Sequence, residues 1–189
     1  MQVTTGKARG HKLLSVPGDT TRPITDMVKQ ALFNIVAGDV QEATWLDLFA
    51  GTGAVGIEAL SRGARSVTFA DRAAAAIETI YKNLNGTKLL ASAAVIKQDA
   101  FAYIGGHPNT QYDVIYIAPP QWLSLWSKAL RAIDQNPGWV AETGDIIVQI
   151  APTEFEDIPL DHFEMYDRRK YGQTVLCFYE RKEVLRPES

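Results

Sequence analysis

The stretch "LDLFAGTGAVGIEAL" (residues 46–60) decides the fold. It passes from an apolar, strand-like segment into a helix-like segment, and three glycines lie at the junction. Gly51, Gly53 and Gly56 follow the pattern G-x-G-x-x-G. Glycine allows the backbone to turn tightly and to approach a ligand closely. The stretch therefore predicts a strand, a glycine loop and a helix that together form one side of a nucleoside-binding site.

Outward from this stretch, strand patterns alternate with helix patterns. Short apolar strands that alternate with helices predict a mostly parallel sheet with helices on both faces. The end of the chain differs, because the strand-like segments 162–171 and 173–181 meet near Gly172 with no helix between them. They predict a C-terminal antiparallel hairpin. The other predicted strands are 44–49, 66–70, 93–98, 112–118 and 144–150, and the predicted helices are 21–38, 54–63, 73–85 and 123–135.

Three aspartates stand at the ends of three successive predicted strands. Asp71 follows Gly51 by 20 residues, where a carboxylate accepts hydrogen bonds from ribose hydroxyls. Asp47 lies just before the glycine loop, where it would repel a pyrophosphate and suit a cationic amine, as in S-adenosylmethionine. Asp99 ends the third strand and can accept a hydrogen bond from an adenine amino group. The alternative interpretation is that these aspartates cap helices and turns.

Composition and length limit the class of protein. The chain has 189 residues, 46% of them hydrophobic and 22% charged, so we expect one globular domain. The sequence has no apolar run of membrane-spanning length and no signal-peptide pattern at its start. Cys177 is the one cysteine, which excludes a disulfide within the chain and a Cys-rich metal site. We expect a cytoplasmic protein without a membrane segment, and the three scattered histidines predict no metal.

Basic residues gather in two places despite a net charge of −3. One group precedes the first helix, and the other lies in the second half of the chain, in the hairpin. Each can be a solvated surface segment or a set of phosphate contacts. We divide the chain into a basic N-terminal arm (1–21), a single domain (22–183) and a tail (184–189). The candidate RNA-binding residues are Lys7, Arg9, His11, Lys12, Arg22, Arg168, Arg169 and Lys170.

Three stretches of the sequence carry a resemblance to a known family. Residues 21–36 ("TRPITDMVKQALFNIV"), residues 46–64 and the strand that ends in Pro119 and Pro120 closely resemble the RsmD-like family. The resemblance runs from about residue 9 to residue 181, nearly the whole chain. Members of this family are methyltransferases that modify N2 of a guanine in small-subunit ribosomal RNA.

The resemblance implies a fold, a methyl donor and a partner. The implied fold is the α/β, Rossmann-like fold of class I methyltransferases, with a seven-stranded, mostly parallel sheet. The implied donor is S-adenosylmethionine, and the implied partner is ribosomal RNA, within a small-subunit particle. We expect a monomer. Arg22, Pro23 and Asp26 match the family's N-terminal motif over the pocket. The candidate donor-binding residues are Asp47, Phe49, Gly51, Gly53, Asp71, Arg72, Asp99 and Ala100.

The catalytic loop departs from the family pattern. That pattern is Asp or Asn, then two prolines, then an aromatic residue, whereas this chain has Ala118 before the prolines and Gln121 after them. Ala118 has no hydrogen-bond acceptor for the target amino group, and Gln121 has no ring to stack on an extruded base. The candidate catalytic residues are Pro119, Pro120, Gln121 and Trp122.

Three functions follow from these observations. The first is an S-adenosylmethionine-dependent guanine-N2 methyltransferase with a divergent catalytic loop. The second, motivated by Ala118, is a weak or inactive relative that binds the donor and RNA or a protein partner. In that case "APPQW" (118–122) is only a rigid exit from the strand. The third is a nicotinamide-dependent enzyme, which the glycine loop permits but Asp47 and the C-terminal hairpin disfavour.

Overall fold

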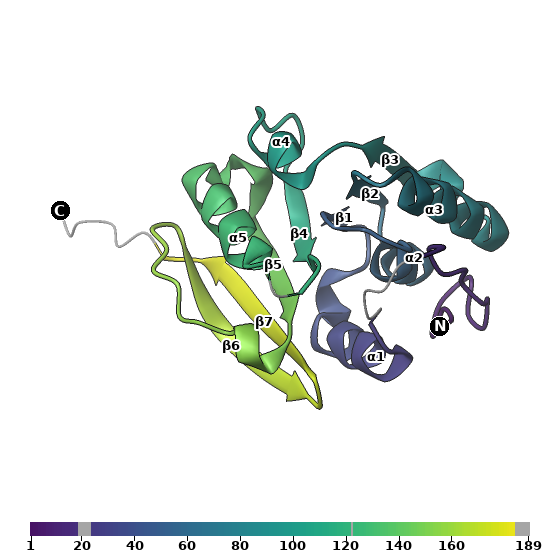
Figure 1. The fold of residues 1–189 in the computed structure, drawn as a ribbon, viewed down its shortest axis with the longest axis horizontal. Coiled ribbons are helices and arrows are strands. Elements are labelled where there is room, and N and C mark those ends of the chain that lie inside the picture. Colours follow the sequence, from purple (N-terminus) through teal and green to yellow (C-terminus); the bar gives the residue numbers. More distant parts are fainter. Residues whose placement is uncertain (19–23, 122, 184–189) are drawn as a thin grey trace.

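The computed structural model describes residues 1–18, 24–121 and 123–183, and its centre is a seven-stranded sheet. The strand order is β3-β2-β1-β4-β5-β7-β6 (Figure 1). Strands β1 to β5 run parallel to one another, while β7 is antiparallel to both β5 and β6. The predicted parallel sheet with a terminal hairpin is therefore confirmed. The strands are β1 (Thr44–Asp47), β2 (Ser66–Asp71), β3 (Ala93–Lys97), β4 (Tyr112–Ile117), β5 (Val140–Ile150), β6 (Phe163–Tyr171) and β7 (Thr174–Arg181).

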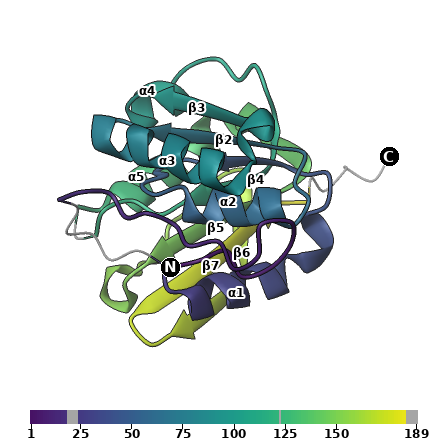
Figure 2. The ribbon, with the colours of Figure 1, turned by 90° about the vertical axis from the view of Figure 1, so that its right-hand side faces the viewer.

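Helices cover both faces of this sheet, as predicted (Figure 1), and Figure 2 views the face that carries α1, α2 and α3. Helices α1, α2 and α3 pack on one face, where Leu32, Ile57 and Ile80 join one apolar cluster. Helices α4 and α5 pack on the other face, where Ile104 and Leu130 join a second cluster. The helices are α1 (Asp26–Ile35), α2 (Ala54–Ser61), α3 (Ala74–Thr87), α4 (Ala100–Ile104) and α5 (Leu125–Gln135). Short 3₁₀ turns are at Ala37–Asp39, Leu90–Ser92, Pro137–Trp139 and Pro152–Glu154.

Several boundaries differ from the prediction by a few residues, and helix α1 begins at Asp26, after its N-cap Thr25, and not at residue 21. Strand β5 begins at Val140, before the predicted residue 144, and the exposed Glu142 and Thr143 hide this start in the sequence. Helix α4 was not predicted, because five residues are too few to show a helical period. In the part of the chain that the structure describes, every helix is too short or too polar to cross a membrane.

The N-terminal segment is packed against the domain along much of its length. Gln2 and Lys12 form an antiparallel bridge, and the side chains of Val3 and Leu13 are buried in the cluster of α1 and α2. The sequence predicted an arm and not a core element, so these two apolar residues correct that interpretation. Val3 stands between polar neighbours, and Leu13 is followed by the exposed Leu14, so neither residue belongs to a periodic apolar pattern.

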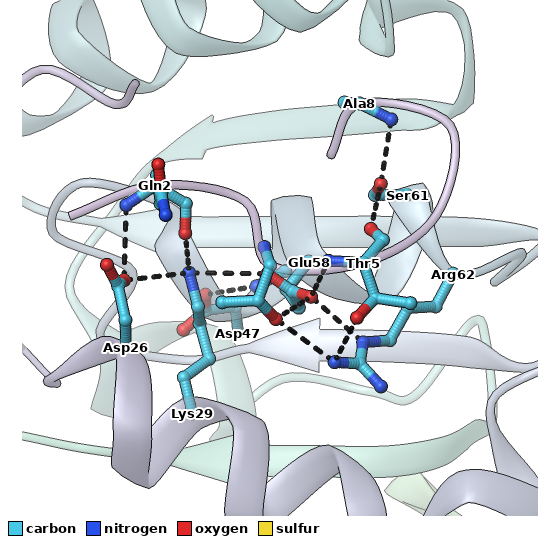
Figure 3. Close-up of polar contacts among 11 residues, drawn as sticks. Gln2, Thr5, Ala8, Asp26, Lys29, Asp47, Glu58, Ser61 and Arg62 are labelled. Atoms are coloured by element: carbon cyan, nitrogen blue, oxygen red, sulfur yellow. Dashed lines mark hydrogen bonds and ion pairs between the residues drawn. The ribbon is translucent and has the colours of Figure 1, made fainter. Parts of the chain in front are cut away.

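A buried carboxylate anchors this segment to α2. Glu58 is fully buried, and it accepts hydrogen bonds from the backbone N–H of Thr4 (2.8 Å) and Thr5 (3.0 Å) (Figure 3). On its other sides it pairs with Lys29 of α1 (3.3 Å) and with Arg62 (2.9 Å). Residues 1–5 are thereby fixed to two helices before the chain reaches the carboxyl edge of the sheet.

Candidate donor-binding and catalytic site

A cavity of about 840 Å³ opens at the carboxyl ends of the parallel strands. This is the edge at which open α/β sheets bind ligands. The glycine loop forms its floor, and Val16, Pro17, Gly18 and Ile24 contribute to its wall. A cavity of this size can hold a nucleoside-sized ligand together with part of a second molecule. The predicted residues on its wall are Asp47, Phe49, Gly51, Asp71, Arg72, Asp99, Ala100, Pro119, Pro120 and Gln121.

Asp71 orders the glycine loop from the end of β2. Its Oδ2 accepts the N–H of Gly51 (2.9 Å), and its Oδ1 accepts the N–H of Ala73 (2.8 Å). Gly51 and Gly53 have positive φ angles of 53° and 75°, a conformation that other residues adopt only with strain. Each carboxylate oxygen has a second lone pair available toward the cavity.

The third glycine of the motif serves packing. A Cβ at Gly56 would lie 2.3 Å from Cε1 of Phe69, so the missing side chain lets α2 approach β2 closely. Gly53 precedes α2 and does not line the cavity wall with Gly51. The G-x-G-x-x-G pattern thus divides into a turn at the ligand and a helix–sheet contact behind it.

Asp99 occupies the N-cap of α4. Its Oδ1 accepts the N–H groups of Phe101 (2.9 Å) and Ala102 (3.2 Å). Asp99 therefore caps a helix, as the alternative interpretation predicted, and it also lines the cavity. Ala100 follows it as a buried residue on the same wall.

Asp47 is the most buried of the three aspartates. It is 3% exposed, and its Oδ2 accepts the N–H of Gly56 (3.2 Å). Burial raises the pKa of this carboxyl to about 8, the Gly56 N–H opposes the rise, and the charge of Asp71 adds to it. A positive charge brought into the cavity beside Asp47 would lower that pKa again.

The loop after β4 forms the part of the wall next to the glycine loop, because β4 pairs in parallel with β1. Ala118, Pro119, Pro120 and Gln121 all line the cavity, whereas Trp122 lies outside the described residues. The loop therefore presents no carboxylate of its own to the cavity between residues 118 and 121. Asp113 cannot substitute, because it lies at the other end of β4, where it accepts the N–H of Thr44 (2.7 Å).

Sequence reasoning missed two polar residues on this wall. Tyr116 of β4 and Gln149 of β5 line the cavity, and the Tyr116 hydroxyl donates a hydrogen bond to Gln149 Oε1. Tyr116 is buried in an apolar cluster, and its position in the apolar strand 112–118 gives no sign that it also reaches the cavity. The available signal for Gln149 was one polar residue near the end of the apolar strand "DIIVQI" (145–150).

The predicted RNA-binding residues lie on two separate elements. Lys7, Arg9 and Lys12 are exposed on the N-terminal segment, and His11 is half-buried near Gly86. The other three belong to β6 at the sheet edge, where strand alternation separates them. Arg168 and Lys170 pair with Cys177 and Val175 of one apolar cluster, and Arg169 pairs with Leu176 of the other. Arg22 lies outside the described residues.

Two of the hairpin cations already have protein partners. The Arg168 guanidinium lies 4.2 Å from the centre of the Phe155 ring, and Arg169 Nε lies 2.8 Å from Asp167 Oδ2. The run "RRK" (168–170) therefore does not form a single basic patch.

Comparison with known proteins assigns the chain to a family. The family model described as "Conserved hypothetical protein 95" matches residues 1–180. The chain belongs to this RsmD-like family. The Escherichia coli (strain K12) protein named "Ribosomal RNA small subunit methyltransferase D" is 30% identical over 186 residues, which cover 96% of this chain and 90% of the relative.

Solved structures agree with the RsmD-like assignment. The Escherichia coli protein yhhF has a TM-score of 0.85 and 29% identity, and the match covers 96% of this chain and 98% of that one. An RNA methyltransferase from Salinibacter ruber, solved with S-adenosyl-L-homocysteine, has a TM-score of 0.66 and 12% identity over 88% of this chain and 98% of that one. The last likeness shows the fold alone. The predicted class I methyltransferase fold is therefore confirmed.

Proposed function

We propose that this protein transfers a methyl group from S-adenosylmethionine to the exocyclic N2 of a guanine in small-subunit ribosomal RNA. The observation that carries the proposal is one cavity shared by the strand-end aspartates and the Pro-Pro loop. The name of the Escherichia coli relative supports the ribosomal RNA substrate. The Salinibacter ruber structure, which holds the demethylated donor, supports the choice of donor.

Each chemical group of S-adenosylmethionine has a suitable residue in the cavity. Asp71 has free lone pairs for ribose hydroxyls, and Gly51 beside it leaves space for close approach. Asp99 can accept from the adenine amino group while Phe49, Arg72 and Ala100 form the adjoining wall. Asp47 faces the place of the cationic amine, and Gly53 supports the loop from behind.

The reaction at guanine determines which groups the cavity must present around the Pro-Pro loop. The donor supplies the methyl group: the N2 lone pair bonds to the methyl carbon, the carbon–sulfur bond breaks with its electron pair staying on sulfur, and N2 releases a proton to water. That lone pair is delocalised into the ring, so acceptors that bind the N2 hydrogens assist the transfer. Pro119 and Pro120 hold the chain rigid at this point, and Gln121 is exposed beside them.

The RNA reaches the cavity as an extruded base. The exposed cations Lys7, Arg9 and Lys12 suit phosphate contacts away from the cavity, since the Lys7 backbone is bound to Ser61 at the far end of α2, and Lys170 suits a contact on the hairpin. The net charge of −3 is small support for tight binding to naked RNA. We therefore include in the proposal a small-subunit particle as substrate and a monomeric enzyme, since contacts within the particle can supply the missing affinity.

Ala118 favours a second candidate function. Without the family's acidic or amide side chain at this position, the same cavity can bind donor and RNA without useful turnover. Such a protein would act as an assembly factor that occupies the site on the ribosomal particle.

One experiment separates these two functions. Labelled S-adenosylmethionine is incubated with the protein and with small ribosomal subunits from a strain that lacks it, with naked ribosomal RNA alongside. Stoichiometric labelling at N2 of one guanine is expected. Donor binding measured on the same sample, with no labelling of either substrate, would contradict the enzyme and support the binding protein.

The affinity for S-adenosylmethionine is expected to rise between about pH 6 and pH 8. The pKa of Asp47 is raised to about 8, so its carboxyl is mostly protonated at lower pH, and a bound ammonium must displace that proton. The affinity should change by up to about tenfold per pH unit below the raised pKa. Calorimetry at pH 6, 7 and 8, in two buffers of different ionisation enthalpy, measures both affinity and proton release. Asp47→Asn should remove the proton release, and equal wild-type affinity at pH 6 and 8 would refute the assignment.

A further inference from the structure

Gln149 stands beside the catalytic position on the neighbouring strand. The parallel register of β4 and β5 aligns Tyr116 with Ile147 and Ile117 with Val148, so the next pair in the row is Ala118 and Gln149. Tyr116 and Ile147 belong to the same apolar cluster, and Ala118 packs against it. Because side chains alternate along a strand, Gln149 lies on this same face. Ala118 and Gln149 both line the cavity.

A buried hydroxyl fixes the amide of Gln149. Tyr116 is 3% exposed, and burial together with the nearby Asp47 raises its pKa well above the ordinary value, so the phenol keeps its proton. Its O–H donates a hydrogen bond to Gln149 Oε1, which holds the amide in one orientation. A carbonyl oxygen has two lone pairs, and an amide nitrogen has two hydrogens. Among the residues that the structure describes, one acceptor site and two donor sites of Gln149 have no protein partner and can bind a ligand.

We propose that Gln149 hydrogen-bonds the target guanine and supplies the acceptor that Ala118 lacks. The inference rests on the proposed function and names a specificity residue for it. On the guanine edge that receives the methyl group, N2–H is a donor and the adjacent N3 is an acceptor. The amide of Gln149 matches this pair, with Oε1 accepting from N2–H and Nε2 donating to N3. This is the planar, two-bond recognition by which amide side chains distinguish bases.

The role of Gln149 is recognition and alignment of N2, and it takes no proton. An amide is not a base at neutral pH, so the N2 proton still leaves to water. A bond from N2–H to Oε1 holds the amino group in one orientation toward the donor. Tyr116, which acts through its hydrogen bond to Gln149, is a positioning residue in this arrangement.

The test compares Gln149→Ala with the wild type in methyl transfer to small ribosomal subunits. We expect kcat/KM for the subunit to fall about 10²-fold, as when one preorganised hydrogen-bonding group is lost. Calorimetry should give an affinity for S-adenosylmethionine within twofold of the wild type. Gln111→Ala is the matched control, because Gln111 is an exposed glutamine just before the opposite end of β4. It should leave kcat/KM unchanged.

Two further variants make the test specific. Ala118→Asp in the Gln149→Ala protein should restore at least about tenfold of the lost rate, since it returns an acceptor to the neighbouring position. Tyr116→Phe should lower kcat/KM by about tenfold with donor affinity retained, because the amide of Gln149 loses its fixed orientation.

The outcomes separate this inference from the proposed function. Wild-type rates in Gln149→Ala, or a loss of rate matched by an equal loss of donor affinity, would overturn the role of Gln149 while the methyltransferase function stands. Absence of transfer by the wild type would overturn the function and, with it, this inference. A specific loss in Gln149→Ala that Ala118→Asp repairs supports the inference.

Discussion

Replacing Ala118 by aspartate is expected to raise the rate of methyl transfer about 10²-fold at saturating donor. Residue 118 lines the cavity at the exit of β4, and a carboxylate there can accept hydrogen bonds from the target amino group. A positioned group of this kind contributes about 10²–10⁴-fold to a reaction. The lower end of that range is expected if Gln149 already supplies one acceptor. The measurement is single-turnover transfer of labelled methyl to small ribosomal subunits.

Variants with side chains of similar size provide the control. Ala118→Asn offers a neutral acceptor of the same shape and should give a smaller gain, whereas Ala118→Val fills the same space without an acceptor and should give none. Donor affinity, measured on each variant, should stay near the wild-type value. If Ala118→Asp and Ala118→Val have the same rate, the absence of an acceptor at residue 118 does not limit this enzyme.

The sequence predicted those parts of the site that depend on local pattern. The glycine loop and the three strand-end aspartates follow from one rule, that ligands of open α/β sheets bind at the carboxyl ends of the strands. Asp47, Asp71 and Asp99 therefore meet at one cavity although 52 residues separate the first from the last. The C-terminal hairpin was equally predictable, because no helix pattern interrupts its two strands.

Contacts that depend on how the strands pair could not be predicted from such sequence patterns. Gln149 becomes a neighbour of Ala118 only because β4 and β5 pair with Ile117 beside Val148. The packing of Val3 and Leu13 likewise depends on tertiary contacts, the bonds of Thr4 to Glu58 and of Leu13 N–H to the Met1 carbonyl, which the sequence of the N-terminal segment does not reveal. Single polar or apolar residues carry no period, so their partners emerge only from the tertiary structure.

Replacing Glu58 by leucine is expected to lower the free energy of unfolding by about 3–5 kcal/mol, the cost of breaking a buried ion pair. Lys29 and Glu58 are both fully buried, and the change leaves the Lys29 ammonium without its buried counter-ion. The backbone N–H groups of Thr4 and Thr5 lose their acceptor as well. Urea unfolding at pH 7 measures the effect.

Matched variants distinguish this network from an ordinary salt bridge. Glu78→Ala removes an exposed helical pair with Lys82 and should change stability little. Lys29→Met combined with Glu58→Leu should recover part of the lost stability, because the buried ammonium is removed, while Arg62 keeps its hydrogen bonds to the Thr4 and Thr5 hydroxyls. A Glu58→Leu protein no less stable than Glu78→Ala would show that the network does not support the fold.

The contribution of Glu58 to stability depends on pH with a definite sign, which a comparison with the Glu58→Gln variant measures. Burial acts to raise the pKa of Glu58, but hydrogen bonds from Thr4 and Arg62 and the charge of Lys29 outweigh it and hold the pKa below its ordinary value. A lowered pKa means that the stabilisation is complete above the pKa of the unfolded chain, about 4.5. It is lost as the pH falls through the folded-state pKa. The difference between wild type and Glu58→Gln should therefore shrink below about pH 4.

Loss of the Glu58 contacts should also lower the affinity for the donor. The segment that Glu58 holds continues to Val16, Pro17 and Gly18, which form part of the cavity wall. Amide exchange in residues 2–13 should accelerate in Glu58→Leu, and the affinity for S-adenosylmethionine should fall even where the protein remains folded. Unchanged donor affinity alongside fast exchange would show that the N-terminal segment does not contribute to donor binding. A joint loss would mean that a buried ion pair behind α2 maintains one wall of the cavity.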